Sequence, residues 1–349
     1  MHHTDKDMLL DIEELKSVEP TKYIEVDWFL RLLGIPSDYS YPTVPVYEYY
    51  SNPTKEDTDG DGYCDYDEVK VYNTNPKISN VEKYEISDIE FLTIDTGNST
   101  KYDWTYYGNG STKSYGGRQG WFRYIMTESD AYNNETYGRY LTSQTIAKSG
   151  CGLISSADSL LYISKHMGIS NYIIKDWYQN DVIDINDYAE YIWYMESTQL
   201  GVDSTLGLNG YSMASGLNNY YSLHDIDLKA TWGVDEYDIL DKTIKMLKKD
   251  IPVTLSIGPY ALGLKDGYGV NFYIEDISSS TPAYINRPWS SDKVNDHYVT
   301  VTAVIIDNIT NKTYLQISSW GEKYFIDYDE YEEYLGYKLS GFSNILYIS

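Results

Sequence analysis

The sequence predicts an α+β fold in which helices come first and most strands come last. Apolar residues recur at helical spacing over 152–167 and again over 235–250. Runs typical of strands follow at 252–258, 297–306 and 313–321. Because helices and strands do not alternate regularly, this order favours an α+β domain over a doubly wound parallel sheet.

The first segment, residues 1–50, predicts helical and extended chain. Apolar residues at helical spacing predict one helix over 8–18, and a Glu-Pro pair ends it. A second short helix is expected over 26–33, with Gly34 just past its end.

Two segments of different composition follow. Residues 51–80 are rich in Asp and Gly and are bracketed by Pro53 and Pro76, so we expect a small separate module there. Residues 81–349 begin with a strand expected over 89–94 and are long enough for one large α+β domain with its own core.

The charge of the chain restricts its partners. The 349 residues include 53 acidic and 27 basic side chains, and the formal net charge is −26. A polyanion repels nucleic acid and anionic lipid, so neither is expected as a partner. No stretch approaches the roughly 18–20 apolar residues that a membrane span needs. The acidic start lacks the apolar core of a signal peptide.

Residues 57–68, DTDGDGYCDYDE, match the twelve-residue calcium loop position by position. Gly62 falls at position 6, where the chain must turn sharply. Ca²⁺ is a hard cation that takes about six to eight oxygens, which suits this density of carboxylates. The alternative is a solvated acidic turn, in which these carboxylates would repel each other. The predicted ligands are Asp57, Asp59, Asp61, the backbone carbonyl of Tyr63, Asp65 and Glu68.

The wider pattern around this loop, NPTKEDTDGDGYCDYDE followed by YNTNP, resembles the bacterial thrombospondin type 3 calcium repeats. This resemblance implies a Ca²⁺ cofactor and a secreted or cell-surface protein, possessing a functional domain beside the repeat. The chain departs from it in carrying a single copy and in placing Cys64 at loop position 8.

Cys151 is the candidate nucleophile. Two cysteines are too few for a disulfide framework, which leaves a single bridge or free thiols open. Cys151 falls at the start of a predicted amphipathic helix, where the helix dipole favours a thiolate. Gln144 lies seven residues earlier and can supply an amide N–H to an oxyanion. The alternative role for Cys151 is a small buried apolar residue.

His297 is the candidate base. His166 ends the helix that Cys151 begins, about 22 Å away, and His224 lies in a polar stretch. His297 instead opens the predicted strand HYVTVTAVII, and the next strand ends in Ser318-Ser319-Trp320-Gly321. The alternative role for His297 is a hydrogen-bonded core histidine.

These elements resemble the papain-like cysteine peptidases, most closely the double-glycine leader peptidase branch, over about residues 140–335. The resemblance implies a helix that carries the cysteine and an antiparallel sheet that carries the histidine. It implies Cys151 as nucleophile, His297 as general base and then acid, and Gln144 as oxyanion donor. Ser318 takes the place of the family's Asn or Asp that orients the histidine, and its hydroxyl supports an imidazolium less well than a carboxylate.

Three classes of function follow from the sequence. The first is a secreted or surface cysteine peptidase that acts on a peptide or protein substrate and is stabilised by Ca²⁺. The second is a papain-like surface binding or adhesion module with weak or absent catalysis, which the serine at position 318 favours. The third is another thiol acyl-transfer enzyme, such as a cell-wall amidase, which fits the surroundings of Cys151 and His297 less well.

Overall fold

The computed structural model describes twelve stretches of the chain, and the expected helices over 8–18 and 26–33 lie outside them. The described residues are 22–25, 43–46, 51–52, 54–97, 113–167, 182–204, 207–233, 239–258, 269–274, 287–288, 293–336 and 345–349.

The chain divides into two compact units. The first contains Met1–Glu82 together with Asp276–Ala283 and Asp307–Thr310, and the second contains the remaining residues. In the first unit β1 (Lys22–Glu25) pairs antiparallel with β2 (Thr43–Val46). The acidic loop of this unit is followed by two short helices, α2 (Asp65–Asp67) and η1 (Glu68–Tyr72).

The second unit is α+β, as the sequence predicts, and is built on one sheet that contains both short and long strands. The described strands run in the order β6-β13-β7-β10-β11-β12-β8-β9, and β3 also pairs with β10. The bounds are β3 (Val81–Glu85), β6 (Ala230–Trp232), β7 (Val253–Ile257), β8 (Tyr273–Ile274), β9 (Arg287–Pro288), β10 (His297–Asp307), β11 (Lys312–Ser319), β12 (Glu322–Asp327) and β13 (Ile345–Ile348).

The centre of the sheet is antiparallel and buried. His297 at the start of β10 pairs with Ile257 at the end of β7, and every residue of β7 is buried. Strand β7 also pairs antiparallel with β13. The sequence of β7, VTLSI, alternates apolar and hydroxyl side chains, and Thr254 and Ser256 are buried as well, so both faces of the strand are covered.

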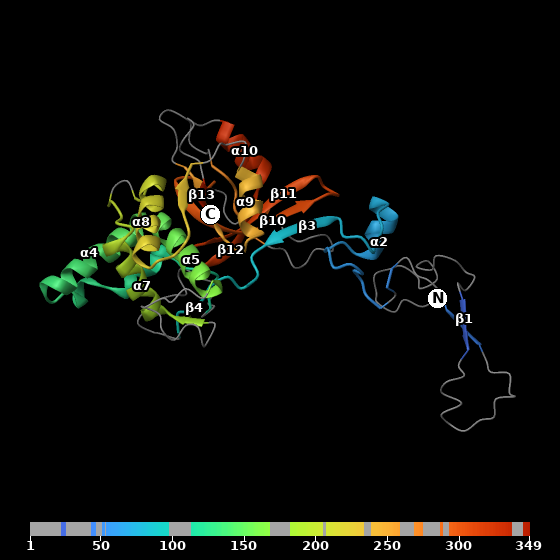
Figure 1. Cartoon of the computed structure of the whole chain (residues 1–349), viewed down its shortest axis with the longest axis horizontal. Helices are drawn as coiled ribbons and strands as arrows, with labels where there is room; N and C mark the ends of the chain where they lie inside the picture. The colour runs from blue at the N-terminus through green and yellow to red at the C-terminus, as the bar shows by residue number, and fades with distance from the viewer. Residues whose placement is uncertain are drawn as a thin grey trace, which may run out of the picture. The chain divides into compact units, whose positions relative to one another are not determined.

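Helices pack against this sheet (Figure 1). The bounds are η3 (Gln119–Trp121), α3 (Phe122–Ile125), η4 (Glu128–Asp130), α4 (Asn134–Ser149), α5 (Cys151–His166), α7 (Ile185–Thr198), α8 (Gly210–Leu223), α9 (Ile239–Leu247) and α10 (Tyr328–Gly336). Figure 1 shows α4, α5, α7 and α8 grouped together beside the sheet. A small parallel pair, β4 (Thr93–Asp95) with β5 (Val182–Asp184), replaces the longer strand expected over 89–94.

Helix α5 is the centre of the core. Every residue from Gly152 to Ser164 is buried, because the helix packs against α4, α7, α8 and β7. Cys151 is therefore held at one end of a rigid element, beside the sheet that carries His297. Among the described helices none combines the length and apolar character that crossing a bilayer requires.

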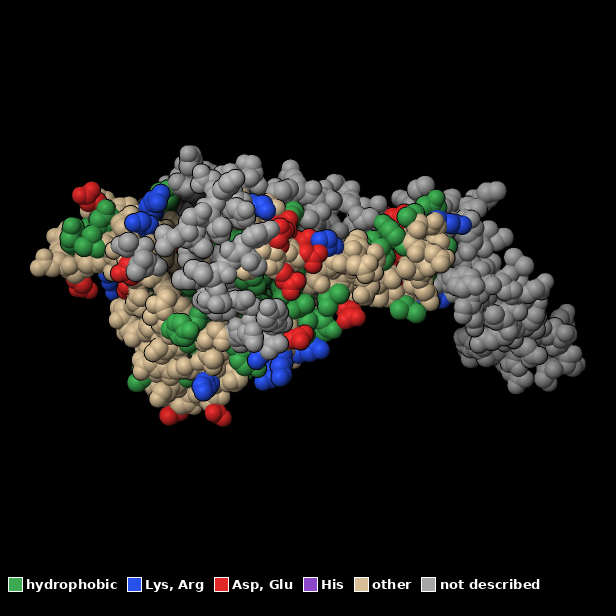
Figure 2. Space-filling view, turned by 90° about the horizontal axis from the view of Figure 1, so that it is seen from above, with side chains coloured by type: hydrophobic (Ala, Val, Ile, Leu, Met, Phe, Trp, Pro, Cys, Tyr) green, Lys and Arg blue, Asp and Glu red, His purple; other side chains and the backbone are tan. Residues whose placement is uncertain are grey.

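Surface side chains of the described residues are mixed in type. Figure 2 shows acidic and basic side chains interspersed on one face, with hydrophobic side chains in separate small patches. Singly exposed apolar residues of this kind are normal for a folded protein and mark no docking site by themselves.

Candidate functional site

The acidic loop of the first unit brings three carboxylates together. One oxygen from each of Asp57, Asp59 and Asp61 lies within 4.8 Å of the others. The turn is fixed by Gly60 and Gly62, whose φ angles are +80° and +95° and whose N–H groups donate to the two oxygens of Asp57 at 2.7 and 2.8 Å. Only glycine adopts such angles without a steric penalty.

Glu68, at the start of η1, is a further carboxylate, and the charges of Asp59 and Asp61 act on it. Its side chain is buried, and Oε1 accepts hydrogen bonds from Thr74 Oγ1 and Asn80 Nδ2 at 3.1 and 2.7 Å. Its Oε2 is buried and has no hydrogen-bond partner among the described residues, and the same holds for Asp59 Oδ2. Burial, reinforced by neighbouring carboxylates, raises the pKa of Glu68 to about 7 and that of Asp59 to about 6. Two orphaned carboxylate oxygens in an acidic loop fit a hard cation.

Two other predicted ligands have different tasks. The Asp65 carboxylate accepts hydrogen bonds from Thr58 N and Thr58 Oγ1 at 2.7 and 2.6 Å, so it holds the loop closed. Its role as a calcium ligand stays a prediction. The Tyr63 hydroxyl donates to Asp307 Oδ2 at 2.7 Å, and its ring is buried. The side chain of Tyr63 thus anchors the loop, while its predicted ligand is the backbone carbonyl.

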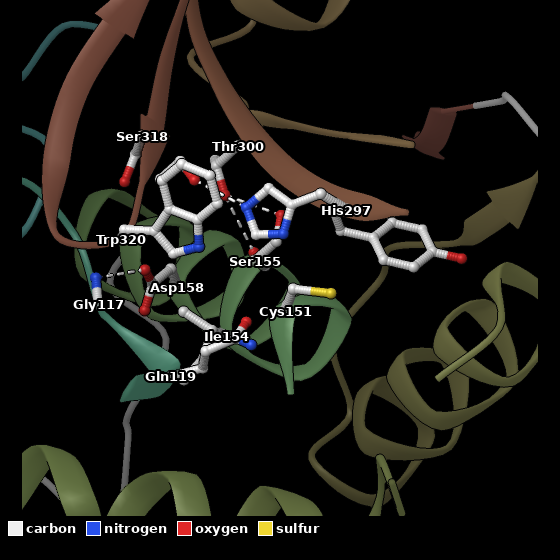
Figure 3. Close-up of a pocket in the computed structure, with 12 residues that line it drawn as sticks. Gly117, Gln119, Cys151, Ile154, Ser155, Asp158, His297, Thr300, Ser318 and Trp320 are labelled. Atoms are coloured by element: carbon white, nitrogen blue, oxygen red, sulfur yellow. Dashed lines mark hydrogen bonds between the residues drawn. The ribbon is translucent and has the colours of Figure 1, made fainter. Parts of the chain in front are cut away.

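Cys151 and His297 line one pocket of the second unit, which has about 260 Å³ of space when open solvent is included (Figure 3). Cys151 is the first residue of α5, follows Gly150, and is half-buried. Neither cysteine forms a disulfide. Burial raises the pKa of the Cys151 thiol to about 11, although backbone hydrogen bonds oppose the shift. The thiolate expected from the helix start is therefore not favoured here, because desolvation outweighs the helix dipole.

His297 is held from two sides. Its Nε2 shares a hydrogen bond of 2.8 Å with Ser319 Oγ, and the Trp320 ring stacks on the imidazole with centroids 4.6 Å apart. Trp320 and Gly321 have φ angles of +50° and +78° and form a two-residue hairpin between Ser319 and Glu322. Burial lowers the pKa of His297 to about 3, so the imidazole is neutral.

Ser318 does not contact His297. Its hydroxyl donates to the carbonyl of Tyr115 at 2.8 Å, and the neighbouring Ser319 supplies the hydroxyl at the imidazole. Successive side chains of a strand point to opposite faces, so the assignment of Ser318 as the orienting residue is corrected by one position.

Gln144 is also absent from the pocket among the described residues. It lies inside α4, and its amide donates to the carbonyl of Met126 at 3.4 Å. Gln119 lines the pocket instead, from η3, and its amide nitrogen donates to the carbonyl of Ala147 at 3.5 Å. Figure 3 shows its side chain on the same side of the pocket as Cys151. The Gly-rich segment SYGGRQG, which contains Gln119, is the sequence feature that could have indicated this residue, because adjacent glycines allow the backbone to approach neighbouring groups closely.

Asp158 is a pocket residue that sequence reasoning missed. It is 1% exposed, and its two oxygens accept hydrogen bonds from Gly117 N and Tyr188 OH at 2.7 and 2.6 Å. Burial raises the pKa of this carboxyl to about 7. It lies seven residues after Cys151, on the same face of α5.

One comparison with known proteins identifies part of the chain. Residues 57–77 match the bacterial TSP3 repeat. The TSP3 repeat is a calcium-binding motif, so the match and the acidic cluster agree. This repeat is typical of extracellular bacterial proteins. No curated protein and no solved structure matches the chain.

Proposed function

We propose that this protein is a secreted or cell-surface cysteine peptidase of papain-like fold, stabilised by calcium at its TSP3 repeat. The observation that carries the proposal is the shared pocket of Cys151 and His297, with Nε2 of His297 held by Ser319. Because that bond occupies Nε2, Nδ1 is the ring nitrogen left to accept the thiol proton. The helix that carries Cys151 packs on β7, which pairs with the strand that carries His297.

The neutral state of both groups defines the first step. With Nε2–H donating to Ser319, Nδ1 takes the proton of Cys151 as the sulfur attacks the scissile carbonyl carbon. The oxyanion that forms accepts hydrogen bonds from the Gln119 amide and from the backbone N–H of Cys151. The imidazolium then protonates the leaving amine, a thioester remains on Cys151, and water activated by His297 hydrolyses it to the carboxylic acid and free thiol.

The calcium ion in this proposal is structural. Asp57, Asp59, Asp61, Asp65, Glu68 and the backbone carbonyl of Tyr63 would hold it, and its charge would offset the repulsion among the carboxylates. Ligand binding to the folded state alone stabilises that state, so calcium raises resistance to unfolding and proteolysis in the first unit.

One observation favours the second candidate, a papain-like binding module without catalysis. The pKa of Cys151 is raised and that of His297 is lowered, and the residue that orients the imidazole is a neutral hydroxyl. These features disfavour a thiolate–imidazolium pair, on which papain-like catalysis relies. A module that binds peptide in the same pocket without cleaving it would need none of this charge separation.

Turnover of a broad fluorogenic peptide library separates the two candidates. The variants are Cys151→Ala, His297→Gln and, as matched control, Cys64→Ala, which removes the other half-buried cysteine. A peptidase loses turnover with the first two variants and keeps it with the control. Absence of turnover by both wild type and Cys151→Ala, together with peptide binding by both, supports the binding module and contradicts the peptidase.

A further inference from the structure

The chain that leads into η3 is fastened by its backbone. Tyr115 N donates to the carbonyl of Gly321 at 2.8 Å, and Gly116 N donates to the carbonyl of Leu92 at 2.7 Å. Gln119 follows three residues after Gly116. We call this segment, which leads from Tyr115 into η3, the approach to Gln119. The position of the Gln119 side chain depends on how firmly the segment is held.

Two side chains fasten the same stretch. Ser318 donates to the carbonyl of Tyr115 at 2.8 Å, and Asp158 accepts the N–H of Gly117 at 2.7 Å. Asp158 in turn accepts the hydroxyl of Tyr188, which is fully buried. The approach to Gln119 is thus tied to β11 on one side and to α5 and α7 on the other.

The glycines show how closely these groups meet. A Cβ on Gly116 would overlap the Ser318 hydroxyl, and Gly116 has a φ of +76°. A Cβ on Gly117 would overlap the hydroxyl of Tyr188. Any larger residue at either position would push the chain away from Asp158. The Gly-Gly sequence is therefore required for the contacts that hold this segment.

Burying a carboxylate costs free energy unless hydrogen bonds or opposite charges compensate for its lost hydration. Asp158 contributes to the pocket that contains Cys151, and both of its oxygens are engaged, which makes it a fixed acceptor and not a free acid. Burial holds its pKa near 7, and the N–H of Gly117 favours the ionised form. A carboxylate in this position is a strong, shape-specific anchor for one backbone N–H.

We infer, resting on the peptidase function proposed above, that Asp158 is a positioning residue for the oxyanion site. By holding Gly117, with Tyr188 and Ser318 as supports, it fixes the start of η3. The Gln119 amide, one N–H of which donates to the carbonyl of Ala147, can then offer its second N–H to the oxyanion formed at Cys151. Asp158 itself touches no reacting atom. Asp158 should therefore affect the stability of the transition state. Displacing an oxyanion donor by about 1 Å lowers the rate roughly a hundredfold.

The test compares Asp158→Ala, Asp158→Asn and Tyr188→Phe, with Tyr191→Phe as matched control. Tyr191 lies on the same helix, is fully buried, and donates to the carbonyl of Ala157 at 2.8 Å without touching the approach to Gln119. The measurements are kcat and KM on the best fluorogenic peptide of the library, and hydrogen exchange of the peptide that spans residues 113–121.

We expect Asp158→Ala to lower kcat by about 10- to 100-fold with KM within about twofold, and to speed exchange over 113–121. Asp158→Asn keeps an oxygen for Gly117 and should restore most of kcat. Tyr188→Phe should fall between them, and Tyr191→Phe should match wild type in both measurements.

Two outcomes separate this inference from the proposed function. If wild type cleaves peptides and Asp158→Ala is equally active, the positioning role is overturned and the peptidase function is not. Loss of kcat that Asp158→Asn does not restore, or that Tyr191→Phe reproduces, also overturns it, because a general loss of packing then explains the effect. Absence of Cys151-dependent turnover in wild type overturns the peptidase function and the inference with it.

Discussion

The indole of Trp320 stacks on the imidazole of His297 at 4.6 Å between ring centroids, with 26° between the ring planes. Trp320 reaches this position from a left-handed backbone conformation, which a bulky residue adopts only at a cost. A strained tryptophan over a buried histidine indicates that the stacking serves the pocket. We expect it to shield the buried hydrogen bond between His297 and Ser319 from water.

Removing this cover should raise the pKa of His297. Burial holds that pKa near 3, far below the ordinary 6.5, because the charged imidazolium is desolvated. In Trp320→Ala water reaches the ring, so its pKa should move up towards 6.5. NMR titration of the imidazole from pH 4 to 8, assigned with His297→Gln, should show no titration of His297 in wild type and a clear one in the variant. Identical curves would mean that Trp320 does not control the solvation of His297.

Replacing Ser319 or Ser318 should lower turnover, but through different contacts: Ser319 bonds to His297 and Ser318 bonds to Tyr115. Ser319→Ala removes the hydrogen bond to Nε2, worth about 1 kcal/mol, and should lower kcat by about tenfold or less while shifting the pH dependence of the rate. Ser318→Ala leaves His297 untouched and should lower kcat without shifting that pH dependence. Matching pH profiles for the two variants would contradict this division of roles.

Glu68 should control calcium affinity. Glu68→Gln keeps the size of the side chain and one carbonyl oxygen but removes the charge and the bidentate option at the orphaned Oε2. Calorimetry should give weaker Ca²⁺ binding by about tenfold or more, and chelation should lower the Tm of wild type more than that of the variant. Asp67→Asn, at a half-buried acidic neighbour outside the predicted ligand set, is the control and should bind as wild type does. Equal affinities for Glu68→Gln and wild type would exclude Glu68 as a ligand.

Asp158 should make stability fall as pH rises. Its folded pKa is about 7 against an ordinary 3.8, so between these values the folded state binds more protons than the unfolded state. The free energy of unfolding therefore decreases from about pH 4 to pH 7, and this contribution is fully present only below the ordinary pKa. Denaturant titrations at pH 5 and pH 8 should give a smaller loss for Asp158→Asn than for wild type. An equal loss would show that Asp158 does not titrate in this range.

Much of the main fold was predictable because its core elements have regular patterns. The helix that begins at Cys151 has apolar residues at helical spacing, and the strands over 297–307 and 312–319 are rich in β-branched and apolar residues; the structure confirms these elements. Helix α7 escaped prediction because its buried face uses Tyr188 and Tyr191, whose hydroxyls find partners only in the folded protein.

The candidate pocket was predictable only in part. A cysteine at a helix start and a histidine at a strand start are local signals, and both side chains line the pocket. The choice between Ser318 and Ser319 depends on which face of β11 meets the histidine, which a one-residue change of register reverses. Gln119 is brought to the pocket by contacts distant in sequence, so no local pattern around Cys151 points to it. Asp158 lies on the same helix as Cys151, but its partners Gly117 and Tyr188 are distant in sequence and become visible only in the folded protein.

The central claim is that Cys151 attacks a peptide carbonyl with His297 as its base. Intact-mass analysis of wild type during turnover of the fluorogenic peptide library tests it most directly, since a thioester adds the acyl fragment of the peptide to the mass of the chain. The account predicts an acyl adduct that maps to Cys151, vanishes in Cys151→Ala and forms more slowly in His297→Gln. Peptide turnover without any adduct on Cys151, or turnover that persists in Cys151→Ala, would contradict it.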